Sequence, residues 1–186
     1  MKKLIYGAMM LAAVAGMTAC GSKKAAKKQP SGMVEDVTPM SGAKYHSDKD
    51  YFRAVQNGVS ADRSIAQKIA MQNCRQELAS NIQAELQLVI ENYLNVKQLP
   101  SGDINSGSYQ ELAYTIVSQK MTDVQIVEEK TYRETENNQY RYYVCLQMPK
   151  AEIEKALEEA LAKDEKINLE FDREQFRAIF ESKIAK

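Results

Sequence analysis

The pattern of apolar and polar side chains predicts one long helix in the middle of the chain. Residues 61–97 contain neither Pro nor Gly, and helix-favouring Ala, Gln, Glu and Leu dominate the segment. Because apolar positions spaced by four advance about 40° per step around a helix, the apolar stripe winds around it. We therefore expect the two halves of the helix to pack on different surfaces, or the helix to bend near its middle. The apolar stripe consists of Ile65, Ile69, Ala70, Cys74, Leu78, Ile82, Leu86 and Ile90.

Residues at both ends of this helix indicate where it begins and ends. The segment 51–56 has strand-like residues, and the Asn57-Gly58 pair after it predicts a turn. Ser60 then offers a helix cap. The run 99–103, Leu-Pro-Ser-Gly-Asp, is expected to end the helix.

The rest of the chain predicts two strands and three shorter helices. Residues 140–148 alternate strongly, with Tyr140, Tyr142, Val144, Leu146 and Met148 on one face. We therefore expect an α+β fold, in which a small antiparallel sheet packs against one long helix and shorter C-terminal helices, as a single domain over residues 50–186. The expected elements are a helix at 109–121, strands at 123–133 and 140–148 joined by a loop at 134–139, a helix at 151–163, and a terminal helix with Phe176, Ile179, Phe180 and Ile184 on one side.

The first 19 residues have the pattern of a secretory signal peptide. Lys2 and Lys3 precede an apolar or small stretch, residues 4–17, which is too short to span a bilayer. The tetrapeptide Met17-Thr18-Ala19-Cys20 resembles the lipobox of bacterial lipoproteins, with Met in place of the usual Leu. This resemblance implies cleavage after residue 19 and lipidation of Cys20. The alternative is an ordinary secretory leader in which Cys20 is incidental.

Residues 20–49 predict a flexible basic linker. They are rich in Lys, Gly, Ser and Pro and have few bulky apolar side chains, so they bury too little surface to offset their ordering entropy. Four lysines directly follow Cys20, where they favour an anionic lipid surface or are simply solvated. In some bacterial groups an acidic run just after the lipidated cysteine resembles a surface-export tag. These positions are basic here, so we predict an outer-membrane anchor facing the periplasm. The four lysines are Lys23, Lys24, Lys27 and Lys28.

The charge balance bears on nucleic-acid binding, and the cysteine content bears on disulfide formation. The chain has 25 basic and 25 acidic side chains, which argues against a general nucleic-acid binder. Cys74 and Cys145 remain once Cys20 is lipidated, and an exported compartment would allow them to form a disulfide. Alternatively, each is a small buried apolar residue.

The start of the domain resembles the Lpp-twenty lipoprotein family and related flagellar-assembly N-terminal domains. The similarity lies in the run 52–60 and in Asn73-Cys74-Arg75-Gln76-Glu77-Leu78-Ala79, followed by a hairpin at 124–148 and a helix. It covers about residues 51–163. The resemblance implies an α+β envelope lipoprotein without known catalysis, and it supplies no catalytic residues.

Candidate catalytic groups are few. The single histidine, His46, lies in the predicted linker, so a catalytic pair or a metal site built on it would require an ordered linker. The adjacent carboxylates Glu128-Glu129 and Glu158-Glu159 should diverge, because neighbours point to opposite faces of a strand and about 100° apart on a helix. We therefore predict no catalytic residues, no metal site and no cofactor.

Four tyrosines around the predicted hairpin form the candidate ligand-binding surface. Tyrosine combines an apolar ring with a polar tip and is suited to recognition. Alternation places Tyr143 on the opposite face from Tyr140 and Tyr142, so one set should pack under helices. The alternative is that the tyrosines are strand formers that stabilise cross-strand pairs. The four are Tyr132, Tyr140, Tyr142 and Tyr143.

The sequence thus favours a non-catalytic envelope lipoprotein that binds or supports another envelope component. Its expected partners are the membrane, through the lipid, and an envelope protein or cell-wall polymer. The alternative is a domain that binds a small ligand or cell-wall polymer, or assists an enzyme, through the tyrosine hairpin and a groove beside the long helix. Arg75 and Arg141 are candidates for polar contacts in that alternative.

Overall fold

The computed structural model describes residues 37–97, 106–164 and 171–184. The predicted leader, Cys20, the linker up to residue 36 and the predicted helix break at 99–103 lie outside these residues. Within the described ranges, no helix is both long and apolar enough to cross a membrane. The elements are η1 (Ala43–Tyr45), β1 (Tyr51–Ser60), α1 (Arg63–Val96), α2 (Ser106–Lys120), η2 (Met121–Asp123), β2 (Gln125–Arg133), β3 (Tyr140–Pro149), α3 (Lys150–Lys163) and α4 (Arg173–Ile184).

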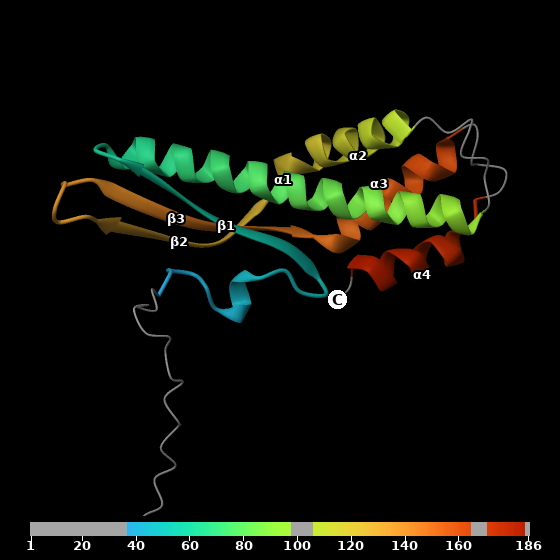
Figure 1. The fold of residues 1–186 in the computed structure, drawn as a ribbon, viewed down its shortest axis with the longest axis horizontal. Helices are drawn as coiled ribbons and strands as arrows, with labels where there is room; N and C mark the ends of the chain where they lie inside the picture. The colour runs from blue at the N-terminus through green and yellow to red at the C-terminus, as the bar shows by residue number, and fades with distance from the viewer. Residues whose placement is uncertain (1–36, 98–105, 165–170, 185–186) are drawn as a thin grey trace, which may run out of the picture. The chain divides into compact units, whose positions relative to one another are not determined.

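The predicted α+β fold is confirmed. An antiparallel three-stranded sheet with the order β1-β3-β2 lies under α1, and the shorter helices gather around the second half of α1 (Figure 1). Strand β3 is central, and its side chains alternate as expected. Tyr142, Val144, Leu146 and Met148 are buried on the α1 side of the sheet.

The two halves of α1 pack on different surfaces, as the winding apolar stripe predicts. The first half crosses β1 and β3 through the small buried residues Ala66, Ala70 and Cys74. The second half contacts α2 and α4, and Tyr93 lies with Phe176 in an edge-on ring contact at 5.9 Å. The prediction is wrong for the first two positions of the apolar stripe. Ile65 and Ile69 are exposed, and the buried row begins at Ala66.

The start of α1 also differs from the prediction. Strand β1 continues through Asn57 and Gly58 to Ser60, so no turn forms at that pair. Asp62 caps the helix instead of Ser60, because its carboxylate accepts hydrogen bonds from the backbone N–H groups of Ser64 and Ile65. The glycine instead allows β1 and α1 to approach each other closely, because a Cβ atom there would collide with the backbone of α1.

The predicted linker is wrong in its last part. Residues 37–50, which we call the strap, lie on the sheet face opposite α1 (Figure 1). Met40 and Tyr45 of the strap are buried against Cys145 and the partly buried Val55, Val127 and Tyr143. The folded domain thus begins at Val37 and not at residue 50. Two large apolar side chains are enough to dock this otherwise polar segment.

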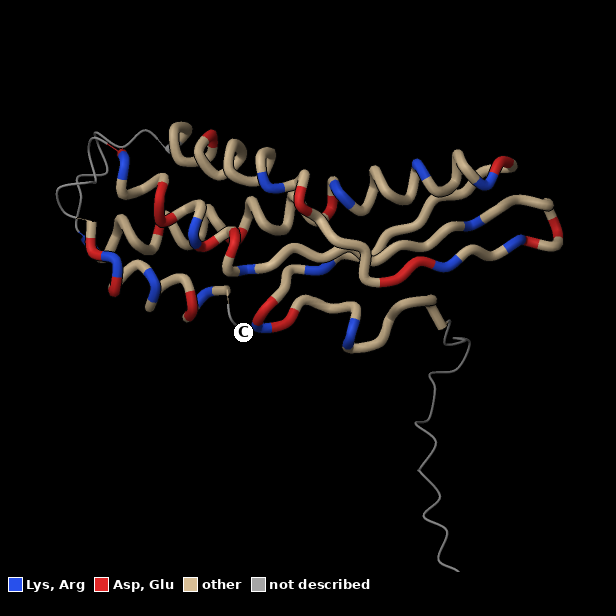
Figure 2. The backbone as a smooth tube through the Cα atoms, turned by 180° about the vertical axis from the view of Figure 1, so that it is seen from behind, with Lys and Arg blue, Asp and Glu red and all other residues tan. Residues whose placement is uncertain are grey.

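Polar contacts fix the strap in place. The Lys44 ammonium and the Tyr45 hydroxyl each donate to the Glu128 carboxylate of β2, both over 2.6 Å. Ser47 exchanges hydrogen bonds with the backbone of Arg53 along the outer edge of β1, which covers part of an edge that would otherwise be open to pairing. Acidic and basic positions are interspersed along the helices and strands (Figure 2).

Candidate functional site

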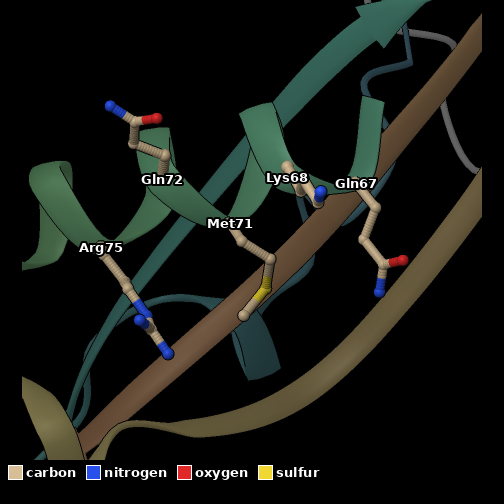
Figure 3. Close-up of a pocket in the computed structure, with 5 residues that line it drawn as sticks. All are labelled: Gln67, Lys68, Met71, Gln72 and Arg75. Carbon is tan, nitrogen blue, oxygen red and sulfur yellow. The ribbon is translucent and has the colours of Figure 1, made fainter. Parts of the chain in front are cut away.

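An open groove lies beside the first half of α1. It has a volume of about 440 Å³. Gln67, Met71 and Arg75 point from α1 over the sheet, whereas Gln72 points away from it (Figure 3). Arg75 and Lys68 supply positive charge, two glutamines supply amides, and Met71 supplies the apolar surface. The lining residues are Gln67, Lys68, Met71, Gln72 and Arg75.

One end of the groove is connected to the sheet by a chain of hydrogen bonds. The Gln67 amide donates to the Tyr142 hydroxyl over 3.2 Å, and this hydroxyl also bonds to the Glu129 carboxylate. Burial and the bond to Glu129 together raise the pKa of Tyr142 to about 12. Glu129 pairs in register with Val144, on the same sheet face as Tyr142, so its carboxylate belongs to the groove side of β2.

The four tyrosines do not form a single surface. Tyr140 and Tyr142 face α1, and the guanidinium of Arg133 lies over the Tyr140 ring at 5.7 Å. Tyr143 lies on the strap side, as the alternation predicts, where its ring meets that of Tyr132 edge-on at 5.8 Å. Only the Tyr142 hydroxyl is therefore connected to the groove.

The possible disulfide is not formed. Both cysteines are buried free thiols on opposite faces of β3: Cys74 faces the sheet from α1, and Cys145 lies under the strap. The Cys74 thiol donates to the backbone carbonyl of Ala54 over 3.1 Å. Burial raises the pKa of Cys74 to about 11 and also raises that of Cys145. Each cysteine acts here as a small apolar residue, the alternative that the sequence left open.

The adjacent carboxylates diverge as predicted. Glu128 binds the strap while Glu129 faces the groove, and Glu158 is buried between two arginines while Glu159 is exposed.

His46 is exposed on the strap, 3.2 Å from the carbonyl of Ser41. In the described part of the chain, no three His, Cys, Asp or Glu side chains come together in a way that could hold a metal ion.

The groove residues are largely missed by sequence reasoning. Gln67, Met71 and Arg75 recur every fourth position, which is the spacing of a helix face, but this row lies beside the apolar stripe and resembles an ordinary solvated face. Only Arg75 is a candidate from the sequence. What makes the row a groove is strand β2, whose position beside β3 depends on the sheet order.

No family model matches the chain, and no curated protein is significantly similar to it.

Proposed function

We propose that this protein is a non-catalytic lipoprotein of the bacterial cell envelope, whose domain binds another envelope component while a lipid on Cys20 holds it at the membrane. The observation that carries the proposal is the leader, in which Lys2 and Lys3, an apolar stretch and a lipobox-like tetrapeptide occur in the order that export and lipidation require. The resemblance of residues 51–163 to the Lpp-twenty family points the same way.

The groove beside α1 supports the binding half of the proposal. It is concave, contains Met71 beside charged and amide groups, and lies on the sheet face opposite the strap. Confinement to a membrane surface raises the effective concentration of the domain near its partner, so a shallow groove with weak contacts is sufficient. The positions after Cys20 are basic and lack the acidic run that resembles a surface-export tag, which favours an outer-membrane anchor that faces the periplasm.

Membrane fractionation and crosslinking in intact cells test the anchor. We expect wild-type protein in the membrane fraction, and we expect Cys20→Ala to lose both membrane association and most of the crosslinked partners. Cys145→Ala is the matched control, because that thiol is buried under the strap. Capture of the same partners in the same yield without Cys20 would show that tethering does not select them.

The alternative, a domain that binds a small ligand or a cell-wall polymer or assists an enzyme, draws on the same groove. Its polar groups converge from one helix face and from Tyr142, which suits a ligand smaller than a folded protein. The two proposals differ in partner size. A soluble fragment of the partner that competes with crosslinking would favour the alternative.

A further inference from the structure

Arg75 is the feature of the groove that most constrains its ligand. Its guanidinium points into the groove (Figure 3) and forms neither an ion pair nor a hydrogen bond with any described residue. A guanidinium offers five N–H donors in a fixed planar fork that matches a carboxylate. Most other described arginines already bond to a polar side chain, namely Arg53, Arg133, Arg141, Arg173 and Arg177.

The opposite end of the groove has a different character. There the Tyr142 hydroxyl and the Glu129 carboxylate provide acceptor oxygens beside Gln67. Eight helical positions separate Gln67 from Arg75, which corresponds to about 12 Å at about 1.5 Å per residue. An extended peptide advances about 3.3 Å per residue, so three to four residues span roughly this distance.

The middle of the groove fits a peptide backbone. The amide of Gln67 provides donors and an acceptor, which can bond to peptide C=O and N–H groups. Met71 lies between Gln67 and Arg75 as a flexible apolar surface for a small side chain. The described residues that line the groove include no aromatic ring on which a sugar could stack.

We propose that this groove binds an extended peptide of three to four residues that presents a carboxylate to Arg75. The peptide lies along α1, with its N–H groups toward Tyr142 and Glu129 and its carboxylate toward Arg75. This inference rests on the proposed function, because it names the ligand chemistry of the binding module.

The test uses the full-length lipidated protein in detergent micelles, labelled at the methionine methyl groups with ¹³C. The probe is N-acetylated tetra-alanine with a free C-terminal carboxylate, and the matched probe is the same peptide as a C-terminal amide. Met71 in the groove reports binding. Met148 in the core and Met40 in the strap are internal controls, since both are buried away from the groove.

We expect the Met71 methyl signal to shift saturably with the free-acid peptide, while the Met148 and Met40 signals stay in place. The amide peptide and the variant Arg75→Gln should each bind about tenfold more weakly, because a charge-assisted pair is lost. Arg75→Lys should bind the free-acid peptide with an affinity between those of wild type and Arg75→Gln, since lysine keeps the charge without the planar fork. Lys183→Gln, at an exposed position on α4, should bind like wild type.

Three kinds of result would overturn the inference. The first is the absence of any Met71 shift at roughly 10 mM peptide, a concentration that would reveal even millimolar affinity. The second is equal binding of the acid and amide peptides, or equal binding by wild type and Arg75→Gln. The third is a Met71 shift with a carboxylate-bearing oligosaccharide but not with the peptide. Failure here leaves the fractionation of Cys20→Ala unchanged, so the two proposals fail separately.

Discussion

Gly58 lies where β1 passes closest to α1. A Cβ atom at this position would stand 2.4 Å from the carbonyl oxygen of Ala66 and 2.6 Å from the backbone nitrogen of Ala70. Both contacts are with helix backbone, which cannot move aside as a flexible side chain can. The glycine therefore sets the distance between strand and helix, and the small residues Ala66 and Ala70 provide the matching surface on α1.

Replacing Gly58 with alanine should destabilise the domain by about 3 kcal/mol, at the upper end of overpacking costs, because the backbone of α1 must shift. Urea denaturation followed by circular dichroism measures this change. Gly42→Ala is the control, since its added Cβ would meet only Tyr45 at 4.0 Å. Equal stability of the two variants would contradict the close approach.

The two free cysteines give a second prediction at this scale. In the Cys20→Ala variant, unfolded without reductant, we expect maleimide to label two thiols per chain, Cys74 and Cys145. In the folded protein neither should react readily near pH 8, because both are buried and burial raises the pKa of each. Mass spectrometry counts the labels, and a folded chain that yields no thiols on unfolding would indicate a disulfide.

Among the elements, the strap is the one whose docking on the sheet depends most on a single side chain, the carboxylate of Glu128. Glu128 accepts from Lys44, Tyr45 and Lys130, and these three partners together lower its pKa to about 2 from an ordinary value of 4.5. A depressed carboxyl pKa stabilises the folded state above the unfolded value and ceases to do so as pH falls through the folded value. The contribution of Glu128 is therefore complete above about pH 4.5 and is lost toward pH 2.

The variant Glu128→Gln should loosen the strap at neutral pH and match wild type near pH 2. Two measurements check this. At pH 7 the labelling rate of Cys145 should rise while that of Cys74, on the other face of the sheet, stays low. In urea denaturation, the stability difference between wild type and variant should shrink as pH falls from 4.5 to 2. Glu129→Gln is the neighbouring control, because Glu129 faces the groove.

The elements themselves were largely predictable because each has a strong periodic signal. The 3.6-residue pattern of α1 and the alternation of β3 each place buried side chains correctly over most of their length. The strap was not predictable, since Met40 and Tyr45 are separated by small and polar residues and follow no period. The Asn57-Gly58 pair was misread because local turn preference cannot reveal that a helix lies against the glycine.

The candidate site was predictable only in part. The alternation along β3 correctly separates Tyr143 from Tyr142, and Arg75 is a candidate from the sequence. Which polar row of α1 becomes the wall of a groove depends on the order β1-β3-β2, and sheet order is a long-range property. No local pattern around Gln67 or Met71 encodes it.

Across the whole molecule, α1 connects two packing regions. Its first half forms the core with the sheet, and its second half forms an aromatic cluster with α4 and the residues just before it. Ring contacts below about 6 Å join Tyr93, Phe171 and Phe176. A rigid helix shared by both regions should make them unfold together.

The variant Phe176→Ala tests this coupling, because Phe176 is fully buried in the aromatic cluster. We expect a loss of about 3–5 kcal/mol in the free energy of unfolding, typical of a large-to-small core change. Native-state hydrogen exchange should show the same loss in the β3 amides as in α4. Tyr114→Ala, at an exposed position on α2, is the control. A loss confined to α4 would show that the regions unfold separately.

The strap also determines how the domain responds to mechanical load. If the lipid on Cys20 is fixed in a membrane, any pull along the chain enters the domain at residue 37 and meets the strap before it meets the sheet. The strap's contacts through Met40, Tyr45 and Lys44 lie in sequence along the segment, so they break one after another rather than all at once. Release would extend the chain by up to roughly 45 Å at about 3.3 Å per residue. Under such a load the strap would therefore detach first, while α1, the sheet and the groove beside α1 stay folded.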